Sequence, residues 1–161
     1  MAQQLSSQLV WDALGKELFA VLGMVNAKGQ ARTVGIVYVV HDKKLYISTE
    51  KDAWKTKHTR KNPDVSLTVP IAKRIPFMPF IKIPAATITF SGVARVLDAE
   101  KVALDIRQKL LRGLAEDTDR LANMGIIEVE PVGDFITYGV GVPMMQMRDT
   151  KKARGRAPVH A

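Results

Sequence analysis

Hydrophobic and polar positions alternate in several short stretches of the chain, as expected for strands that bury one face. The first such stretches lie within residues 18–49, where runs rich in β-branched and aromatic residues are separated by turns at residues 28–29 and 41–44. Connections as short as these predict three strands in an antiparallel meander.

Further alternating stretches predict a strand at 64–69, a long strand at 85–97, and two closing strands at 125–131 and 134–142. Gly133, between the closing strands, is expected to mark a bulge or a bend. Many short antiparallel strands with few helices predict a mainly β fold with peripheral α-helices, a closed or partly open β-barrel rather than a doubly wound α/β sheet.

Three segments have helical spacing instead. Apolar residues within 5–13 predict a short amphipathic helix, and a second helix is expected over 52–62, with Asp52 as its N-cap. A third amphipathic helix is expected over 98–114, with Asp98 as its cap. All three are short, so they are predicted to pack against the barrel rather than form a domain.

Residues 70–84 ("PIAKRIPFMPFIKIP") combine four prolines with large apolar side chains. Neither a helix nor a central strand tolerates that many prolines. An apolar loop needs a cover, so the segment is predicted to be a lid over a ligand or a dimer contact, with local core packing as the alternative.

Composition narrows the classes of function. The 161 residues, 47% hydrophobic and 25% charged, suit one folded domain, assigned to residues 1–150, with a mobile or surface-lying basic tail at 151–161. The absence of cysteine excludes disulfides, thiolate metal sites and cysteine nucleophiles. The histidines lack metal-ligand spacing, and no carboxylate pair or His-Asp grouping indicates a catalytic side chain. The N-terminus has neither a signal-peptide nor a membrane-span pattern, so a cytoplasmic location is expected.

A net charge of +8 favours an anionic partner, which leaves nucleic acid, an acidic protein or a small phosphorylated molecule open. The cations are densest in residues 46–63 ("YISTEKDAWKTKHTRKNP"). A strand ending in Ser48-Thr49, followed by a helix with Lys55 in its first turn, is a candidate phosphate site, because helix N–H groups, a hydroxyl and an ammonium all favour an anion.

The same stretch, with the strands before it, resembles the pyridoxamine 5'-phosphate oxidase-like superfamily of flavin-binding split β-barrels. The resemblance is carried by Thr49, Lys55 and Asn62-Pro63 at the family spacing, and it extends from about residue 5 to residue 142. It implies an FMN bound at the interface of a homodimer, with Thr49 and Lys55 on the phosphate.

Further positions follow from the resemblance. Tyr46 and Ser48 lie beside Thr49 on the same strand and are candidate cofactor contacts. Trp54 and Thr33 stand where the true oxidase has arginines. Trp54 either stacks on the flavin or a nucleotide base, or fills the core or an interface. Tyr38 stands in place of a lysine, and Arg32 is displaced by one position, which turns a strand side chain to the other face. Lys51 is a further candidate, although with Lys57, Arg60 and Lys61 it can simply solvate the helix.

The predicted function is therefore an FMN-dependent oxidoreductase acting on an unidentified small molecule, in which the flavin carries the chemistry and no side chain need be an acid or a base. The C-terminal region offers only Arg148 where the true oxidase holds pyridoxal phosphate, so vitamin B6 oxidation is not expected. A deazaflavin-dependent reductase and a non-catalytic flavin-binding protein remain as alternatives. A haem-binding barrel and a nucleic-acid-binding barrel are less favoured, because only His58 could approach the cavity and aromatics are only 6% of the chain.

Overall fold

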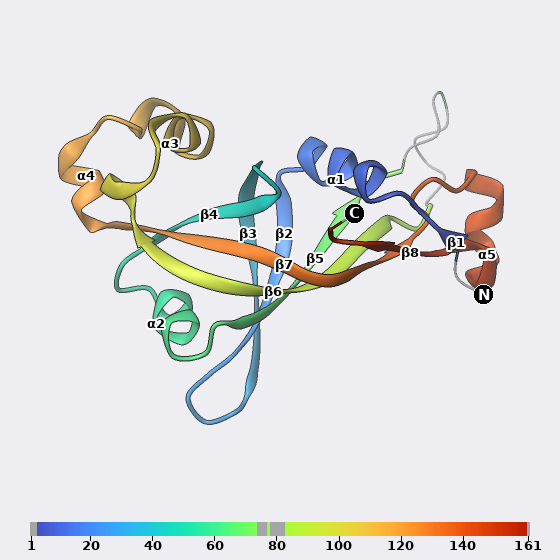
Figure 1. Cartoon of the computed structure of the whole chain (residues 1–161), viewed down its shortest axis with the longest axis horizontal. Helices are drawn as coiled ribbons and strands as arrows, with labels where there is room; N and C mark the ends of the chain where they lie inside the picture. The colour runs from blue at the N-terminus through green and yellow to red at the C-terminus, as the bar shows by residue number, and fades with distance from the viewer. Residues whose placement is uncertain (1–2, 74–76, 78–82, 161) are drawn as a thin grey trace.

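The alternating stretches form one antiparallel sheet that closes on itself (Figure 1). The computed structural model describes residues 3–73, 77 and 83–160. Strands β7, β4, β3, β2, β5 and β6 follow one another around a barrel, and β6 pairs back onto β7 to close it. The predicted mainly β barrel with short helices is thus confirmed.

The bounds of the elements are as follows. The strands are β1 (Gln3–Gln4), β2 (Phe19–Val25), β3 (Ala31–His41), β4 (Lys44–Glu50), β5 (Asp64–Ile71), β6 (Ala86–Asp98), β7 (Met124–Tyr138) and β8 (Arg154–Pro158). The α-helices are α1 (Ser7–Lys16), α2 (Trp54–Lys61), α3 (Leu104–Leu111), α4 (Thr118–Asn123) and α5 (Thr150–Ala153). Short 3-10 turns are η1 (Ala99–Lys101), η2 (Arg112–Leu114) and η3 (Met144–Arg148). No helix in the described part of the chain is long and apolar enough to cross a membrane.

The predicted meander is present as β2, β3 and β4, paired antiparallel. Asp42 and Lys43 both have positive φ, as a two-residue turn matched to strand twist requires. At the other hairpin, the Asn26 side chain accepts hydrogen bonds from the Lys28 and Gln30 N–H groups. The turn residues therefore fix the register of these strands.

The two predicted closing strands are in fact one. β7 runs without interruption over 15 residues, and Gly133, with φ +73°, lies inside it. The register with β6 shifts between Thr89 and Ser91, opposite this glycine, so the glycine bends the strand without ending it. The first half of β7 pairs with β4 in the barrel, and the second half pairs with β8.

The C-terminal segment, predicted to be mobile or surface-lying, forms a strand of the sheet over part of its length. α5 and β8 occupy 150–158, and β8 pairs antiparallel with β7 and parallel with β1. Ala153, Gly155 and Ala157 are buried, while the arginines between them face outward. The segment has the alternation of a strand, but its buried positions are so small that the hydrophobic pattern is weak.

The helices are only partly as predicted. α1 forms where expected, but the helix expected over 98–114 breaks into η1, α3 and η2, and α4 follows it. The Asp98 side chain makes no capping hydrogen bond; its carboxylate instead lies 3.0 Å from Lys101 Nζ and 3.5 Å from Lys51 Nζ. Most of the predicted loop at 70–84 falls outside the described residues, and Pro70 and Ile71 belong to β5.

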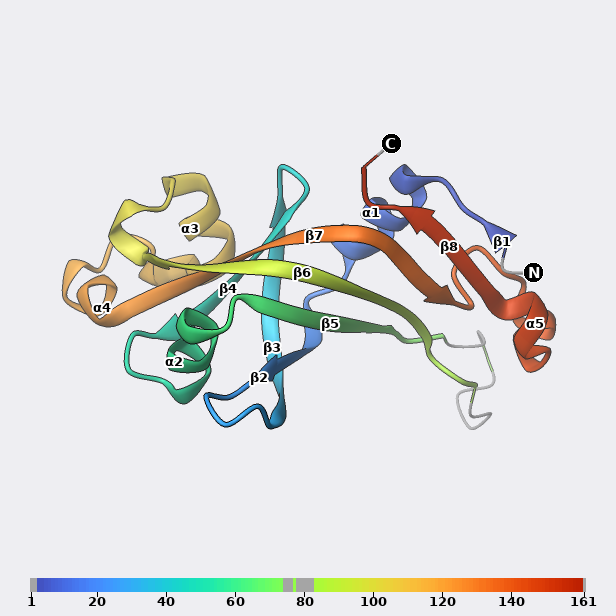
Figure 2. The ribbon, with the colours of Figure 1, turned by 60° about the horizontal axis from the view of Figure 1, so that its bottom comes forward.

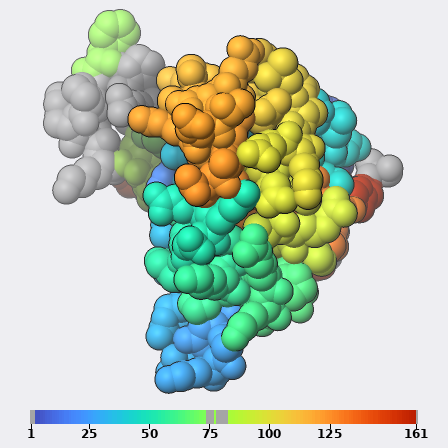
Figure 3. Space-filling model, turned by 90° about the vertical axis from the view of Figure 1, so that its left-hand side faces the viewer, coloured from blue at the N-terminus to red at the C-terminus, as the bar shows by residue number. Residues whose placement is uncertain are grey.

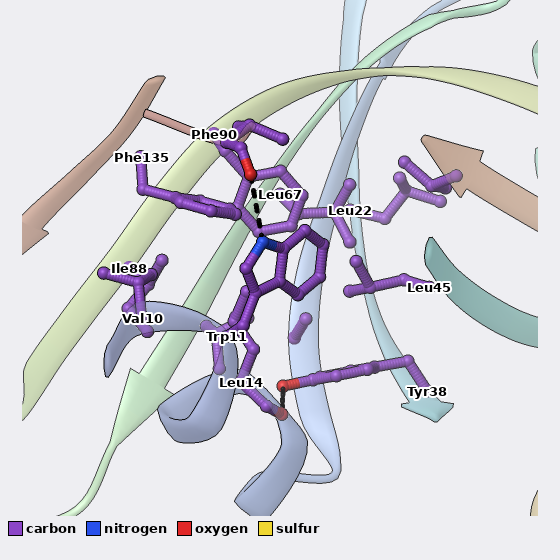
Figure 4. Packing of buried hydrophobic residues seen from close by; sticks show 14 of the residues in the cluster. Val10, Trp11, Leu14, Leu22, Tyr38, Leu45, Leu67, Ile88, Phe90 and Phe135 are labelled. Carbon is purple, nitrogen blue, oxygen red and sulfur yellow. Dashed lines mark hydrogen bonds between the residues drawn. The ribbon is translucent and has the colours of Figure 1, made fainter. Parts of the chain in front are cut away.

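The main core fills the barrel and continues under α1 (Figure 4). Trp11 lies edge-on to Phe135, with ring centroids 5.2 Å apart, and the Tyr38 hydroxyl donates to the Leu14 carbonyl oxygen at 2.8 Å. A second, smaller cluster lies between β4, β7 and the helices α3 and α4, and includes Tyr46 and Ile126. α1 and α2 cover the barrel from opposite ends (Figure 2).

Candidate functional site

The junction between β4 and α2 carries most of the predicted phosphate site. On the face of the molecule in Figure 3, the α2 segment (teal) lies between the β2–β3 hairpin (blue) and the α3–α4 region (yellow to orange). Thr49 is buried at the end of β4, and its Oγ1 lies 3.0 Å from Oγ1 of Thr56, a fully buried residue of α2. Thr56 Oγ1 also donates to the Glu50 carbonyl oxygen at 2.7 Å. The hydroxyl predicted to contact phosphate is thus engaged within the protein.

The start of α2 has no capping side chain. Ala53 occupies the N-cap position, and the predicted cap, Asp52, makes no such bond. The first N–H groups of an α-helix have no partner within the helix, so those of Trp54 and Lys55 remain available to an anion. No acidic residue lies in this first turn, and the prediction of Asp52 as a cap is wrong.

Lys55 is half-buried in that turn. Within residues 3–73, 77 and 83–160, no ion pair involves its ammonium group. Trp54 is 45% exposed, and its ring meets that of His58 at 64° with centroids 5.5 Å apart. Trp54 is therefore not core filling, and a planar face near Lys55 is accessible.

Lys51 lies just before α2 at a separate hollow of about 720 Å³. This hollow lies between the β4–α2 connection and α4, and it is lined by Glu50, Asp52, Leu114 and Arg120 among others. The Lys51 ammonium is 3.5 Å from Asp98, so its charge is already partly compensated.

Tyr46 and Ser48 lie on the opposite face of β4 from Thr49, because strand side chains alternate. The Tyr46 hydroxyl donates to Glu128 Oε2 at 3.0 Å, and Arg95 Nε donates to Glu128 Oε1 at 3.0 Å. Burial, together with the hydrogen bond to Glu128, raises the pKa of Tyr46 to about 12. Burial would raise the pKa of Glu128 as well, but hydrogen bonds from Arg95 and Tyr46 lower it below its usual value. This group holds β4, β6 and β7 together.

Thr33 is exposed on the outer face of β3, at an open hollow of about 460 Å³ that also includes Ser66 and Ser91. Gly23 lies beneath this hollow, and a Cβ there would come within 2.6 Å of Ser66 Oγ. Arg32 does not reach across: its guanidinium donates to the Ala31 carbonyl oxygen and to Gln30 Oε1.

Tyr38, at the position of the family lysine, is fully buried in the core. Of the two β3 positions that the resemblance singled out, Thr33 is thus exposed and Tyr38 belongs to the core. The structure brings Thr49 together with the helix turn that carries Trp54 and Lys55, and leaves Tyr46, Ser48 and Thr33 on other faces.

Sequence reasoning missed Thr56. Its signal is the pair Thr56 and Thr59, three residues apart on a helix that is otherwise mostly charged, which marks the buried face. Among the described residues, no group of three His, Asp or Glu side chains could hold a metal ion.

The barrel closed by β6 and β7, with a helix following β4 at one end, defines a protein of the split β-barrel class. A family model described as pyridoxamine 5'-phosphate oxidase matches residues 9–133, and the chain belongs to this family. No curated protein matches the chain.

Solved structures show the same fold at low identity. An F420 reductase is 18% identical, with a TM-score of 0.55 over 77% of this chain and 93% of its own. HutZ, a haem storage protein from Vibrio cholerae, is 15% identical, with a TM-score of 0.62 over 81% of this chain and 93% of its own. A putative pyridoxamine 5'-phosphate oxidase from Listeria innocua is 16% identical, with a TM-score of 0.57 over 78% of this chain and 92% of its own.

Proposed function

We propose that the protein binds FMN and is a flavin-dependent oxidoreductase, with the FMN phosphate at the start of α2. The observation that carries this proposal is the uncapped first turn of α2, which contains half-buried Lys55 and no acidic residue. Backbone N–H groups at a helix start and an adjacent ammonium together favour a phosphate. Membership of the oxidase family makes a flavin phosphate the natural candidate.

The residues present fit such a group. The N–H groups of Trp54 and Lys55 would bind phosphate oxygens, the Lys55 ammonium would add a full charge, and the exposed Trp54 ring offers a face for stacking. When bound, the flavin supplies hydride transfer. The protein binds and orients the cofactor, and no side chain of this site acts as an acid or base.

A second copy of the chain is part of the proposal. Leu18, Phe19 and Val37 lie on the outside of β2 and β3, or just before β2, and are 55%, 47% and 57% exposed. Phe19 and Val37 are directly paired across the two strands. A partner subunit that covers these side chains would bury apolar surface that the single chain leaves exposed. In the family resemblance the flavin and a small-molecule substrate lie at such an interface.

A deazaflavin cofactor is the second candidate. The exposed side of α2 carries Lys57, Arg60 and Lys61, and within the described residues these cations make no ion pairs. A longer, more acidic cofactor tail would meet them, and one structural neighbour is an F420 reductase. Haem is a weaker third candidate, because His58, the histidine nearest the site, packs edge-on against Trp54.

The test is a fluorescence titration of the purified protein with FMN, using Lys55→Ala and Lys57→Ala as a matched pair from one helix. We expect Lys55→Ala to weaken FMN binding about tenfold or more, the loss of one charge-assisted hydrogen bond. Lys57→Ala should change the FMN affinity less than twofold. The free energy of unfolding of each variant should lie within about 0.5 kcal/mol of the wild-type value. Equal FMN affinities for Lys55→Ala and wild type would reject the assigned phosphate site.

A further inference from the structure

The hydroxyl groups of Thr49 and Thr56 form a buried link between β4 and α2. Thr49 is 5% exposed and Thr56 is fully buried, and their oxygens are 3.0 Å apart. Thr56 Oγ1 is also 2.7 Å from the Glu50 carbonyl oxygen, which only a donor can satisfy. The two side chains therefore tie the last residues of β4 to the first turn of the helix.

Each hydroxyl has one proton to donate. Thr56 gives its proton to Glu50 O, so the proton of Thr49 lies between the two threonine oxygens. The reverse arrangement, with Thr56 donating to Thr49, would leave the 2.7 Å contact between Thr56 Oγ1 and Glu50 O without a proton, so the first arrangement is favoured. In that arrangement both protons are used inside the protein, and Thr49 turns none toward a phosphate oxygen.

Little else anchors the helix start. The only fully buried residues of α2 are Thr56 and Thr59, and its one large apolar side chain, Trp54, is 45% exposed, so the helix contributes little to the apolar core. Backbone hydrogen bonds from Ala53 N to Glu50 O and from Lys51 N to Asn123 O, each 3.1 Å, fix the preceding turn. The position of the first turn thus depends mainly on polar contacts, of which the threonine pair lies deepest.

We propose that Thr49 and Thr56 are positioning residues that hold the first turn of α2, and with it Lys55, in place for the anion, and that Thr49 does not bind the cofactor itself. This inference rests on the proposed flavin site. It assigns Thr49 a different role from direct phosphate contact, and it adds Thr56 as a residue of equal importance.

The experiment compares Thr49→Val, Thr56→Val and the double variant with Thr137→Val. Valine keeps the shape of threonine and removes the hydroxyl. Thr137 is the control because its buried hydroxyl has no hydrogen-bond partner among the described residues. Dissociation constants are measured for FMN and for riboflavin, which lacks the phosphate.

We expect Thr49→Val and Thr56→Val each to weaken FMN binding about five- to tenfold, as for one buried hydrogen bond. The double variant should bind FMN as well as the single variant with the lower FMN affinity, because both substitutions break the same link between β4 and α2. Riboflavin affinity should stay unchanged in all variants, and Thr137→Val should bind FMN like the wild type. Loss of FMN affinity in Thr49→Val but not in Thr56→Val would show direct contact by Thr49 and overturn the proposal.

Amide hydrogen exchange on the flavin-free protein separates this proposal from the proposed function. Exchange at residues 54–57 should accelerate in Thr49→Val and Thr56→Val and stay at the wild-type rate in Thr137→Val. Unchanged exchange in the first two variants would overturn the positioning role even if FMN binds well. Wild-type protein that binds no flavin would reject the proposed function, whereas the exchange rates would still report whether the pair holds α2.

Discussion

The two ends of the barrel are covered by short helices of opposite character. α1 covers one end with Val10, Trp11 and Leu14, all buried, and its N-cap Ser6 accepts a hydrogen bond from the Leu9 N–H group. α2 covers the other end with two threonines, has no side-chain cap, and carries cations on its exposed side. The α1 end therefore extends the hydrophobic core, whereas the α2 end is held by polar contacts.

This difference indicates how stability and binding are divided. Large apolar side chains at the α1 end bury much surface, which contributes most to folding. The α2 end leaves helix N–H groups and an ammonium uncompensated, which costs stability and favours an anion. We therefore expect substitutions at the α1 end to change unfolding and those at the α2 end to change binding.

The strongest test is Trp11→Ala. Trp11 packs edge-on against Phe135 and donates its indole N–H to the Val159 carbonyl oxygen at 3.1 Å. Removing the ring should lower the free energy of unfolding by about 3–5 kcal/mol, measured by urea denaturation. Trp54→Ala, at the other end, should change it by less than about 1 kcal/mol, because that ring is nearly half exposed. Similar losses of unfolding free energy in Trp11→Ala and Trp54→Ala would show that the two ends do not differ in their contribution to stability.

The next test is Tyr38→Phe. This variant removes the hydroxyl that donates to the Leu14 carbonyl oxygen, which then accepts only from the Glu17 N–H group at 3.3 Å, and it should destabilise the protein by about 1 kcal/mol near pH 7. Burial first, and then Glu17, raises the pKa of Tyr38 above its usual value of about 10. Because the pKa of Tyr38 is higher in the folded than in the unfolded protein, its contribution to the free energy of unfolding is fully present below the unfolded pKa. This contribution is lost as the pH rises through the folded pKa. The variant should therefore lack the alkaline loss of stability above pH 10 that Tyr38 causes in the wild type, as followed by urea denaturation at several pH values.

The smallest effect compares the two helix starts directly. Ser6→Ala removes an N-cap and should cost about 1 kcal/mol of unfolding free energy. Asp52→Ala should change it by less than about 0.5 kcal/mol, since Asp52 caps nothing. Thermal denaturation of the two variants side by side gives the measurement, and an equal loss in both would mean that the α2 start is capped after all.

The strands of the barrel could be predicted because their alternation and turns are local. Asp42 and Lys43 form the turn that was predicted between two strand-like runs. β5 and β6 begin and end close to the predicted residues. β8 could not be predicted because its buried positions are Gly155 and Ala157, which carry little hydrophobic signal. A Cβ on Gly155 would lie 2.5 Å from Thr137 Oγ1 and 2.9 Å from the Leu5 side chain. Residue 155 is therefore small because β8 packs closely against residues that are distant in the sequence.

The candidate site was predictable only in part. Lys55 in the first turn of a helix follows from spacing, and the structure keeps it there. The direction of each strand side chain depends on which face of the sheet is buried, so Tyr46 and Ser48 seemed to belong beside Thr49 although they face away. The hydrogen bond between Thr49 and Thr56 joins two elements, and neither residue alone indicates it.

The Val159 carbonyl oxygen accepts hydrogen bonds from the Ser7 hydroxyl and the Trp11 indole, across 152 and 148 residues of chain. A chain growing on the ribosome makes α1 well before the segment around Val159, which follows Trp11 by 148 residues. α1 therefore cannot complete its contacts until that later segment has left the ribosome. Contacts of such long sequence separation slow folding. Until then the apolar face of α1 lacks the hydrogen bonds to Val159 that fix it on the barrel.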